Sequence, residues 1–132
     1  MRKLQGRIQE LLNALGCPEG EVSVSIVDDA EMADLNRQYR KKRGPTNVLS
    51  FPMNEGEGAG LNPLLLGDVV ISADTAFSEA EIGKTTMTAR LTELSIHGVL
   101  HLLGHDHATL KEASAMEALE RAMYKRVTQT IP

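Results

Sequence analysis

The sequence has no tryptophan, few aromatic residues and a single cysteine. Aromatic residues make up 3% of its 132 positions, whereas hydrophobic residues make up 42%. The predicted core is therefore built from Leu, Ile, Val, Met and Ala. Cys17 has no second cysteine with which to form an internal disulfide, and we expect it to be a small space-filling residue.

Long apolar runs are also missing. No stretch approaches the roughly 20 apolar residues of a membrane-spanning helix. The N-terminal segment, MRKLQGRIQELLNALG, lacks the apolar run and cleavage site of a signal peptide. These absences predict a cytoplasmic protein with no membrane partner, and the length predicts one domain over residues 1–132.

The net charge of -4 argues against a protein that coats nucleic acid by bulk electrostatics, so no DNA partner is expected and any RNA contact must be local. One basic cluster is present, formed by Arg37, Arg40, Lys41, Lys42 and Arg43. Taken alone, such a run favours a solvated turn. Beside a metal motif it becomes a candidate RNA contact.

All the histidines of the chain gather in one segment, HGVLHLLGHDH, at positions 97, 101, 105 and 107. On a helix, His97 and His101 stand one turn apart on one face, about 6 Å along the axis. Gly104 is suited to the left-handed residue that ends a helix, which leaves His107 free to supply a third nitrogen. The spacing predicts a metal site formed by His97, His101 and His107.

Three neutral imidazoles leave a tetrahedral ion one open position for water, which is typical of catalytic zinc, and we expect one zinc ion per chain. Nickel and copper also bind imidazole well and remain alternatives. His101, Gly104 and His107 match the second half of the metzincin peptidase signature. Gly98 stands where those peptidases carry a glutamate base, so a peptidase would lack its key catalytic group.

The whole segment resembles the His-Gly-x-Leu-His-Leu-x-Gly-Tyr-Asp-His motif of the YbeY family, bacterial zinc-dependent endoribonucleases of ribosomal RNA maturation, with His105 in place of Tyr. Three further blocks are similar to that family in the same order: Asn36-x-x-Tyr39-Arg40, Thr46 to Pro52, and Leu66 to Ile71. The similarity covers roughly residues 32 to 123. The N-terminal helix and the extreme C-terminus contribute little to it.

The resemblance implies a single-strand-specific, metal-dependent endoribonuclease acting in ribosomal RNA processing and maturation, at the 3' end of 16S rRNA, and in ribosome quality control. It implies that His97, His101 and His107 are the metal ligands and that Arg40 and His97 are the catalytic residues. Partners would be single-stranded or ribosomal RNA, with the ribosome or small-subunit assembly proteins possible. A bidentate guanidinium suits Arg40 to hold the phosphate.

Two alternatives stay open. The first is a zinc-containing ribosome-assembly binding factor with incidental nuclease activity, which a fourth protein ligand such as His105 would favour because a closed site cannot activate water. The second, less favoured, is a zinc peptidase that uses another carboxylate, for example Asp106, as its base. Asp106 is equally suited to orienting a ligand or capping a turn. We expect structural roles for Asp68, at a strand start, and for Thr46 and Asn47, at a strand edge.

The periodicity predicts an α+β fold, with a single small mixed β-sheet of three to four strands covered by about five helices. Expected strands span residues 22–26, with Val22, Val24 and Ile26 on the buried face, 46–51, stopped by Pro52, and 67–72. Expected helices cover 2–15, 28–40, with Tyr39 on the inner face, 72–82, 85–103, the central helix that carries the metal ligands, and 109–127. The Gly-rich segment 53–66 has no period, and we interpret it as a mobile flap that gates access.

Overall fold

A computed structural model describes residues 2–53 and 64–132, and within these the chain forms five helices and one three-stranded sheet. The strands are β1 (Glu21–Val27), β2 (Val48–Pro52) and β3 (Leu65–Ser72). They lie in the order β1-β3-β2, with β1 parallel and β2 antiparallel to β3. The predicted α+β class and mixed sheet are confirmed.

The helices are α1 (Arg2–Ala14), α2 (Asp29–Arg40), α3 (Ala73–Ile82), α4 (Met87–Leu102) and α5 (Leu110–Thr130). Four of them begin at a side chain that accepts a hydrogen bond from the first turn: Asp28, Ser72, Thr86 and Thr109. Such caps satisfy backbone N–H groups that have no partner within the helix. The predicted caps at Asp28, Ser72 and Thr109 are therefore confirmed.

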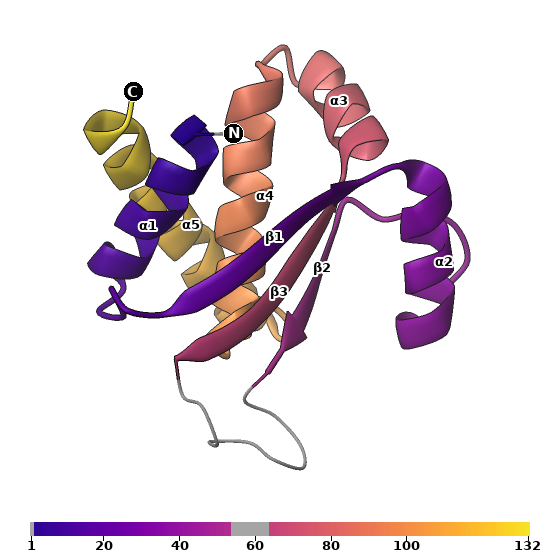
Figure 1. Cartoon of the computed structure of the whole chain (residues 1–132), viewed down its shortest axis with the longest axis horizontal. Coiled ribbons are helices and arrows are strands. Elements are labelled where there is room, and N and C mark those ends of the chain that lie inside the picture. Colours follow the sequence, from indigo (N-terminus) through magenta and orange to yellow (C-terminus); the bar gives the residue numbers. More distant parts are fainter. Residues whose placement is uncertain (1, 54–63) are drawn as a thin grey trace.

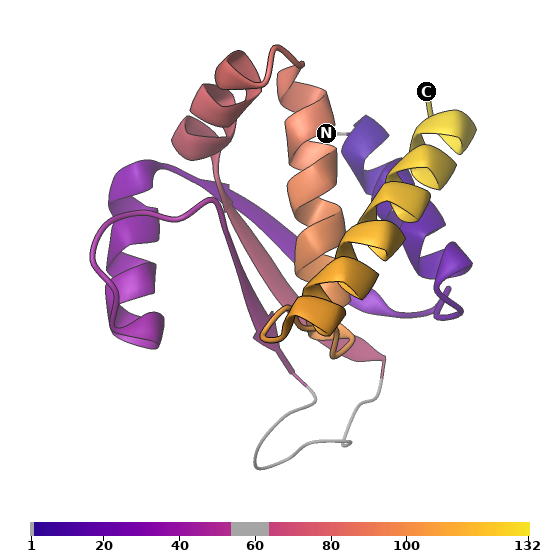
Figure 2. The same ribbon diagram turned by 180° about the vertical axis from the view of Figure 1, so that it is seen from behind.

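Helix α4 crosses one face of the sheet, and α1 and α5 pack side by side over α4, whereas α2 lies on the opposite face (Figures 1 and 2). The larger core lies between α4 and the sheet and includes Val69, Ile71, Val99 and Leu100. A smaller core beneath α2 contains Met32, Leu49 and Val70. Because β3 is central, its side chains alternate between the two cores.

Several predicted details are wrong. The predicted strand ended at residue 51, before Pro52, but β2 includes Pro52 as its last residue. A proline is allowed there because β2 is an edge strand, and its outer side needs no N–H donor. Ile26 lies in the edge strand β1 and is 37% exposed, so only Val22 and Val24 of that face pack against the core. Tyr39 is 64% exposed, because α2 buries Met32 and Asn36 instead.

The predicted flap at 53–66 falls mostly on residues 54–63, which lie outside the described residues. At its end, Leu65 and Leu66 belong to β3, so this strand starts two residues before the predicted position 67. Asp68 therefore lies within the strand and not at its start. Cys17 is half-buried against the larger core, as a space-filling residue would be. No helix in the described part of the chain is long and apolar enough to span a membrane.

Candidate metal centre and adjoining cleft

The histidines of α4 project from one face near its C-terminal end. The Nε2 atoms of His97 and His101 lie 3.2 Å apart, as their spacing of four residues on a helix dictates. His107 joins them from the loop after α4, and one ligand nitrogen from each of the three residues lies within 4.8 Å of the others. The predicted ligand residues are therefore brought together.

Gly104 makes the turn that returns His107 to the helix. Its φ is +97°, a left-handed conformation that a side chain would strain. The N–H of Gly104 donates to the carbonyl of His101 at 3.0 Å, and the N–H of His105 donates to that of Leu100 at 3.0 Å. These paired hydrogen bonds form a Schellman motif, which ends the helix abruptly and directs the chain back.

The surroundings of His101 favour its neutral form. Burial lowers the pKa of His101 below its ordinary value, and the neighbouring His97 and His107 lower this pKa further. A neutral imidazole offers the lone pair that a metal ion needs. His101 is therefore prepared to bind a cation near neutral pH without first losing a proton.

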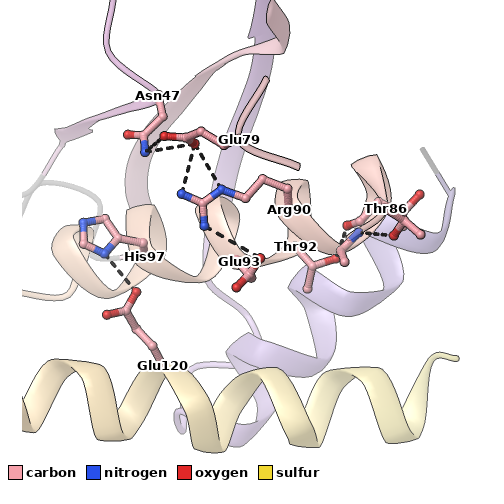
Figure 3. A network of polar contacts seen from close by, with 10 residues as sticks. Asn47, Glu79, Thr86, Arg90, Thr92, Glu93, His97 and Glu120 are labelled. Carbon is pink, nitrogen blue, oxygen red and sulfur yellow. Dashed lines mark hydrogen bonds and ion pairs between the residues drawn. The ribbon is translucent and has the colours of Figure 1, made fainter. Parts of the chain in front are cut away.

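Glu120 of α5 is a part of the site that sequence reasoning missed. Its Oε2 lies 2.9 Å from Nδ1 of His97, and both side chains are partly buried (Figure 3). A carboxylate in this position fixes the orientation of the imidazole and leaves Nε2 unprotonated for a metal. Glu120 lies on the polar part of an amphipathic helix, and only knowledge of how α5 packs on α4 could have identified it.

Gly98 faces the sheet and not the cleft. A Cβ atom at this position would stand 2.6 Å from Cγ1 of Val69, and the carbonyl oxygen of Gly98 accepts a hydrogen bond from Oγ of Ser50 at 2.9 Å. The absence of a side chain thus allows α4 to pack closely on β2 and β3. A glutamate base would not fit at this position.

Arg40 is the last residue of α2, and two contacts made by nearby residues fix the position of this helix end. The buried Asn36 donates from Nδ2 to the carbonyl of Gly44 at 2.9 Å, which folds the basic turn against the helix. Tyr39 packs edge-on against Phe51 of β2, with ring centroids 5.1 Å apart. Arg40 itself is exposed and forms no ion pair with any of residues 2–53 or 64–132.

Arg40 and the three histidines line one cleft of about 570 Å³. Strand β2 lines the cleft with Val48, Leu49, Ser50 and Pro52, and further lining comes from α4 and the loop that follows it. A cation held by the histidines and an exposed guanidinium would face the same space. This arrangement can hold a phosphate group between two positive charges.

The remaining candidates divide between structural and lining roles. Asp106 accepts a hydrogen bond from the backbone N–H of His107 at 2.7 Å, so it caps the loop, although it also lines the cleft. Asp68 is exposed and is absent from the cleft lining. His105 lines the cleft but does not belong to the cluster of ligand nitrogens found among the described residues.

Thr46 and Asn47 lie just before β2, which begins at Val48 and not at the predicted position 46. The carbonyl of Asn47 accepts a hydrogen bond from the N–H of Ser72 at 3.0 Å, in agreement with the strand-edge role expected for it. Its side chain does more, because Nδ2 donates to Glu79 of α3. Asn47 and Thr46 both line the cleft.

Comparison with known proteins identifies close relatives. The sequence profile of the family described as "Endoribonuclease YbeY" matches residues 1–128, so the similarity extends beyond residues 32 to 123 into both termini. A protein of that name from Geobacter metallireducens is 50% identical over 126 residues, which cover 94% of this chain and 82% of the relative. One from Syntrophotalea carbinolica is 48% identical over 123 residues, which cover 92% and 82%.

A solved structure has the same fold. The solution structure of a Thermotoga maritima protein superposes with a TM-score of 0.68 at 27% sequence identity, and the match covers 96% of this chain and 79% of that one. The arrangement of sheet and helices is therefore shared with an experimentally determined protein.

Proposed function

The chain belongs to the YbeY endoribonuclease family, and from this premise we propose that it is a metal-dependent endoribonuclease that hydrolyses phosphodiesters of single-stranded RNA. We further propose that it acts in ribosomal RNA maturation, at the 3' end of 16S rRNA, and in ribosome quality control. The observation that carries the activity is the shared cleft, in which three convergent histidine nitrogens and the guanidinium of Arg40 line one space.

The donor set fits a zinc ion, one per chain. His97, His101 and His107 would hold it, because three imidazole nitrogens that lie within 4.8 Å of one another match the ligand type and number of catalytic zinc. When bound, such an ion supplies Lewis-acid chemistry, polarising a phosphoryl oxygen and lowering the pKa of water. Imidazole also binds nickel and copper, so these ions remain alternatives to zinc.

His97 contributes by holding the ion, since both of its ring nitrogens are engaged. Nδ1 contacts Glu120 at 2.9 Å, and Nε2 faces His101 at 3.2 Å. A histidine used in this way has no free nitrogen with which to exchange a proton with the substrate. Its proposed catalytic role is therefore that of a ligand in a fixed orientation.

Arg40 has the proposed role of gripping the phosphate. Because it forms no ion pair with the described residues, its five N–H donors are available to two phosphate oxygens at once. Negative charge that grows on these oxygens in the transition state is stabilised by the same donors. Lys41, Lys42 and Arg43 are exposed beside it and add a local positive field for an RNA chain.

The two alternatives have less support. A peptidase needs a general base, and the position of the metzincin glutamate is Gly98, where the approach of Val69 leaves no room for a side chain. An assembly factor with a closed structural zinc needs a fourth protein ligand, and His105 is outside the cluster found among residues 2–53 and 64–132. An open site supports catalysis.

The proposed function includes a cellular location, a substrate and partners. We place the activity in the cytoplasm, in one domain over residues 1–132, with RNA as the substrate and the ribosome or small-subunit assembly proteins as partners. DNA is not an expected substrate, because the net charge of -4 argues against bulk electrostatic binding of nucleic acid.

The experiment that tests this function follows cleavage of a labelled single-stranded RNA by the purified protein, after removal of metal with a chelator and after zinc is restored. We expect cleavage to disappear on chelation and to return with zinc. A duplex RNA, a single-stranded DNA and casein serve as alternative substrates under the same conditions. Chelator-sensitive digestion of casein, with RNA left intact, would favour the peptidase instead.

A further inference from the structure

A second cavity, of about 350 Å³, adjoins the cleft. It shares Asn47, Val48 and His97 with the cleft lining, so the two spaces meet at the first metal ligand. Its volume falls within the roughly 300–1,000 Å³ of small-molecule sites in proteins. None of the steps proposed above uses this cavity.

The second cavity is lined by apolar side chains and by equal numbers of positive and negative groups. Val48, Leu94, Ile96 and Tyr124 supply apolar and aromatic surface. The charged lining consists of two guanidinium groups and two carboxylates: Arg90, Arg121, Glu93 and Glu120. This balance gives no preference for an anion, and it suits a neutral group with flat apolar faces, such as a nucleobase.

Asn47 presents one fixed polar group to both cavities. Its Nδ2 atom lies 3.3 Å from each carboxylate oxygen of Glu79. Glu79 is in turn held by Arg90, whose Nε and Nη2 atoms each lie 3.0 Å from Oε1 (Figure 3). Rotating the Asn47 amide by half a turn would place its carbonyl oxygen against this carboxylate, so its orientation is determined.

The Oδ1 atom of Asn47 is therefore a hydrogen-bond acceptor with a fixed orientation. This atom accepts no hydrogen bond from residues 2–53 or 64–132, whereas Nδ2 donates to the carboxylate of Glu79. The Oδ1 atom can therefore accept a hydrogen bond from an N–H group of a base. Adenine, cytosine and guanine can donate from an exocyclic amino group, and uracil can donate from its N3–H group.

We propose that the second cavity binds the base of a nucleotide adjacent to the cleaved phosphodiester, and that Oδ1 of Asn47 accepts a hydrogen bond from an N–H group of that base. This inference rests on the proposed ribonuclease function. The base lies among Val48, Leu94 and Tyr124 while its phosphate occupies the cleft at Arg40 and the histidines. Glu79 is a positioning residue, because it acts through the Asn47 amide, whereas Arg90 both holds Glu79 and lines the cavity.

The test uses oligouridine RNA that contains either one adenosine or one purine riboside, which lacks the amino group of adenosine. Loss of one neutral hydrogen bond should make cleavage beside purine riboside about two- to tenfold slower than beside adenosine. Asn47→Ala should bring this ratio to about one with bound metal unchanged. Glu79→Ala should lower the ratio as well, because the amide can then rotate, while the same change at Glu81, on the exposed side of α3, should preserve it.

Equal wild-type rates beside adenosine and purine riboside, or an unchanged ratio in Asn47→Ala, would overturn the base site. Absence of any wild-type RNA cleavage would instead count against the proposed function. In that case an NMR titration with free nucleosides decides on the base site: adenosine should shift the side-chain amide of Asn47 and the ring of Tyr124 more than purine riboside does. Equal shifts with the two nucleosides would reject it.

Discussion

The Nδ1 atom of His97 lies 2.9 Å from Oε2 of Glu120, which joins the metal-binding helix to the C-terminal helix (Figure 3). The carboxylate accepts a hydrogen bond from Nδ1–H and thereby keeps the proton on Nδ1, which leaves Nε2 unprotonated on the side of His101 and His107. Helix α5 thus belongs to the site, although it supplies no ligand to the cluster.

Substitution of Glu120 should therefore weaken metal binding without unfolding the protein. We expect Glu120→Ala to lower zinc affinity about 10- to 100-fold, the usual effect of removing such a partner, with a smaller loss for Glu120→Gln because its carbonyl oxygen can still accept from Nδ1–H. A competition titration with a chromogenic chelator measures the change. Glu117→Gln, on the same helix, is the matched control, and equal zinc affinity of Glu120→Ala and wild type would refute the role.

Arg40→Ala should retain fold and metal yet lose RNA cleavage. Removal of one donor to transition-state charge typically lowers kcat about 10²- to 10³-fold. Arg40→Lys should recover little, because a point charge cannot reproduce the bidentate contact. Arg37→Ala is the control, since Arg37 lies on the same helix but pairs with Asp34 at 3.0 Å. Full cleavage by Arg40→Ala would reduce Arg40 to a helix-end charge.

Gly98→Ala should destabilise the protein. The added Cβ would stand 2.6 Å from Cγ1 of Val69, so either α4 or the sheet must shift, and overpacking of this kind costs about 1–3 kcal/mol. Thermal unfolding followed by circular dichroism measures the loss. An alanine at Gly83, where the nearest atom would lie 3.2 Å away on an exposed helix end, should be much milder. Equal melting temperatures of Gly98→Ala and wild type would contradict the close packing of α4 on β3.

The metal-free protein should become less stable as pH falls below 6.5. Burial and the neighbouring histidines lower the pKa of His101 from its ordinary value of 6.5 in the folded state only. Between 6.5 and that lower pKa the unfolded chain binds more protons, so the free energy of unfolding decreases as pH decreases through this window. Proton NMR of the His101 ring in metal-free protein should show a titration midpoint below 6.5. A midpoint above 6.5 would reverse the sign of the effect.

The sequence was sufficient for most of the secondary structure and for the clustering of His97, His101 and His107, because both follow from local spacing. Histidines four residues apart share a helix face wherever that helix lies, and a glycine three residues on marks its end. Capping residues such as Asp28, Ser72 and Thr109 likewise act within a few positions of themselves. These features need no knowledge of the tertiary fold.

The features that were missed depend on packing between distant segments. Glu120 lies 23 residues from His97, and the Asn47 to Glu79 contact joins the segment before β2 to α3 across 32 residues. The exposure of Tyr39 and Ile26 was also unpredictable, because periodicity shows which face is apolar but not how far a partner element covers it. Pro52 was predicted to lie just outside the strand, and not to be its last residue, because the edge position of β2 was unknown.

The central claim, that His97, His101 and His107 hold the metal on which RNA cleavage depends, is tested most directly by measuring zinc content and single-stranded RNA cleavage in parallel for wild type and each histidine→alanine variant. We expect about one zinc per wild-type chain, loss of both zinc and cleavage in His97→Ala, His101→Ala and His107→Ala, and retention of zinc in His105→Ala. An empty site in His105→Ala together with a full one in His107→Ala would contradict the ligand assignment, and undiminished cleavage by zinc-free His101→Ala would contradict the metal-dependent mechanism itself.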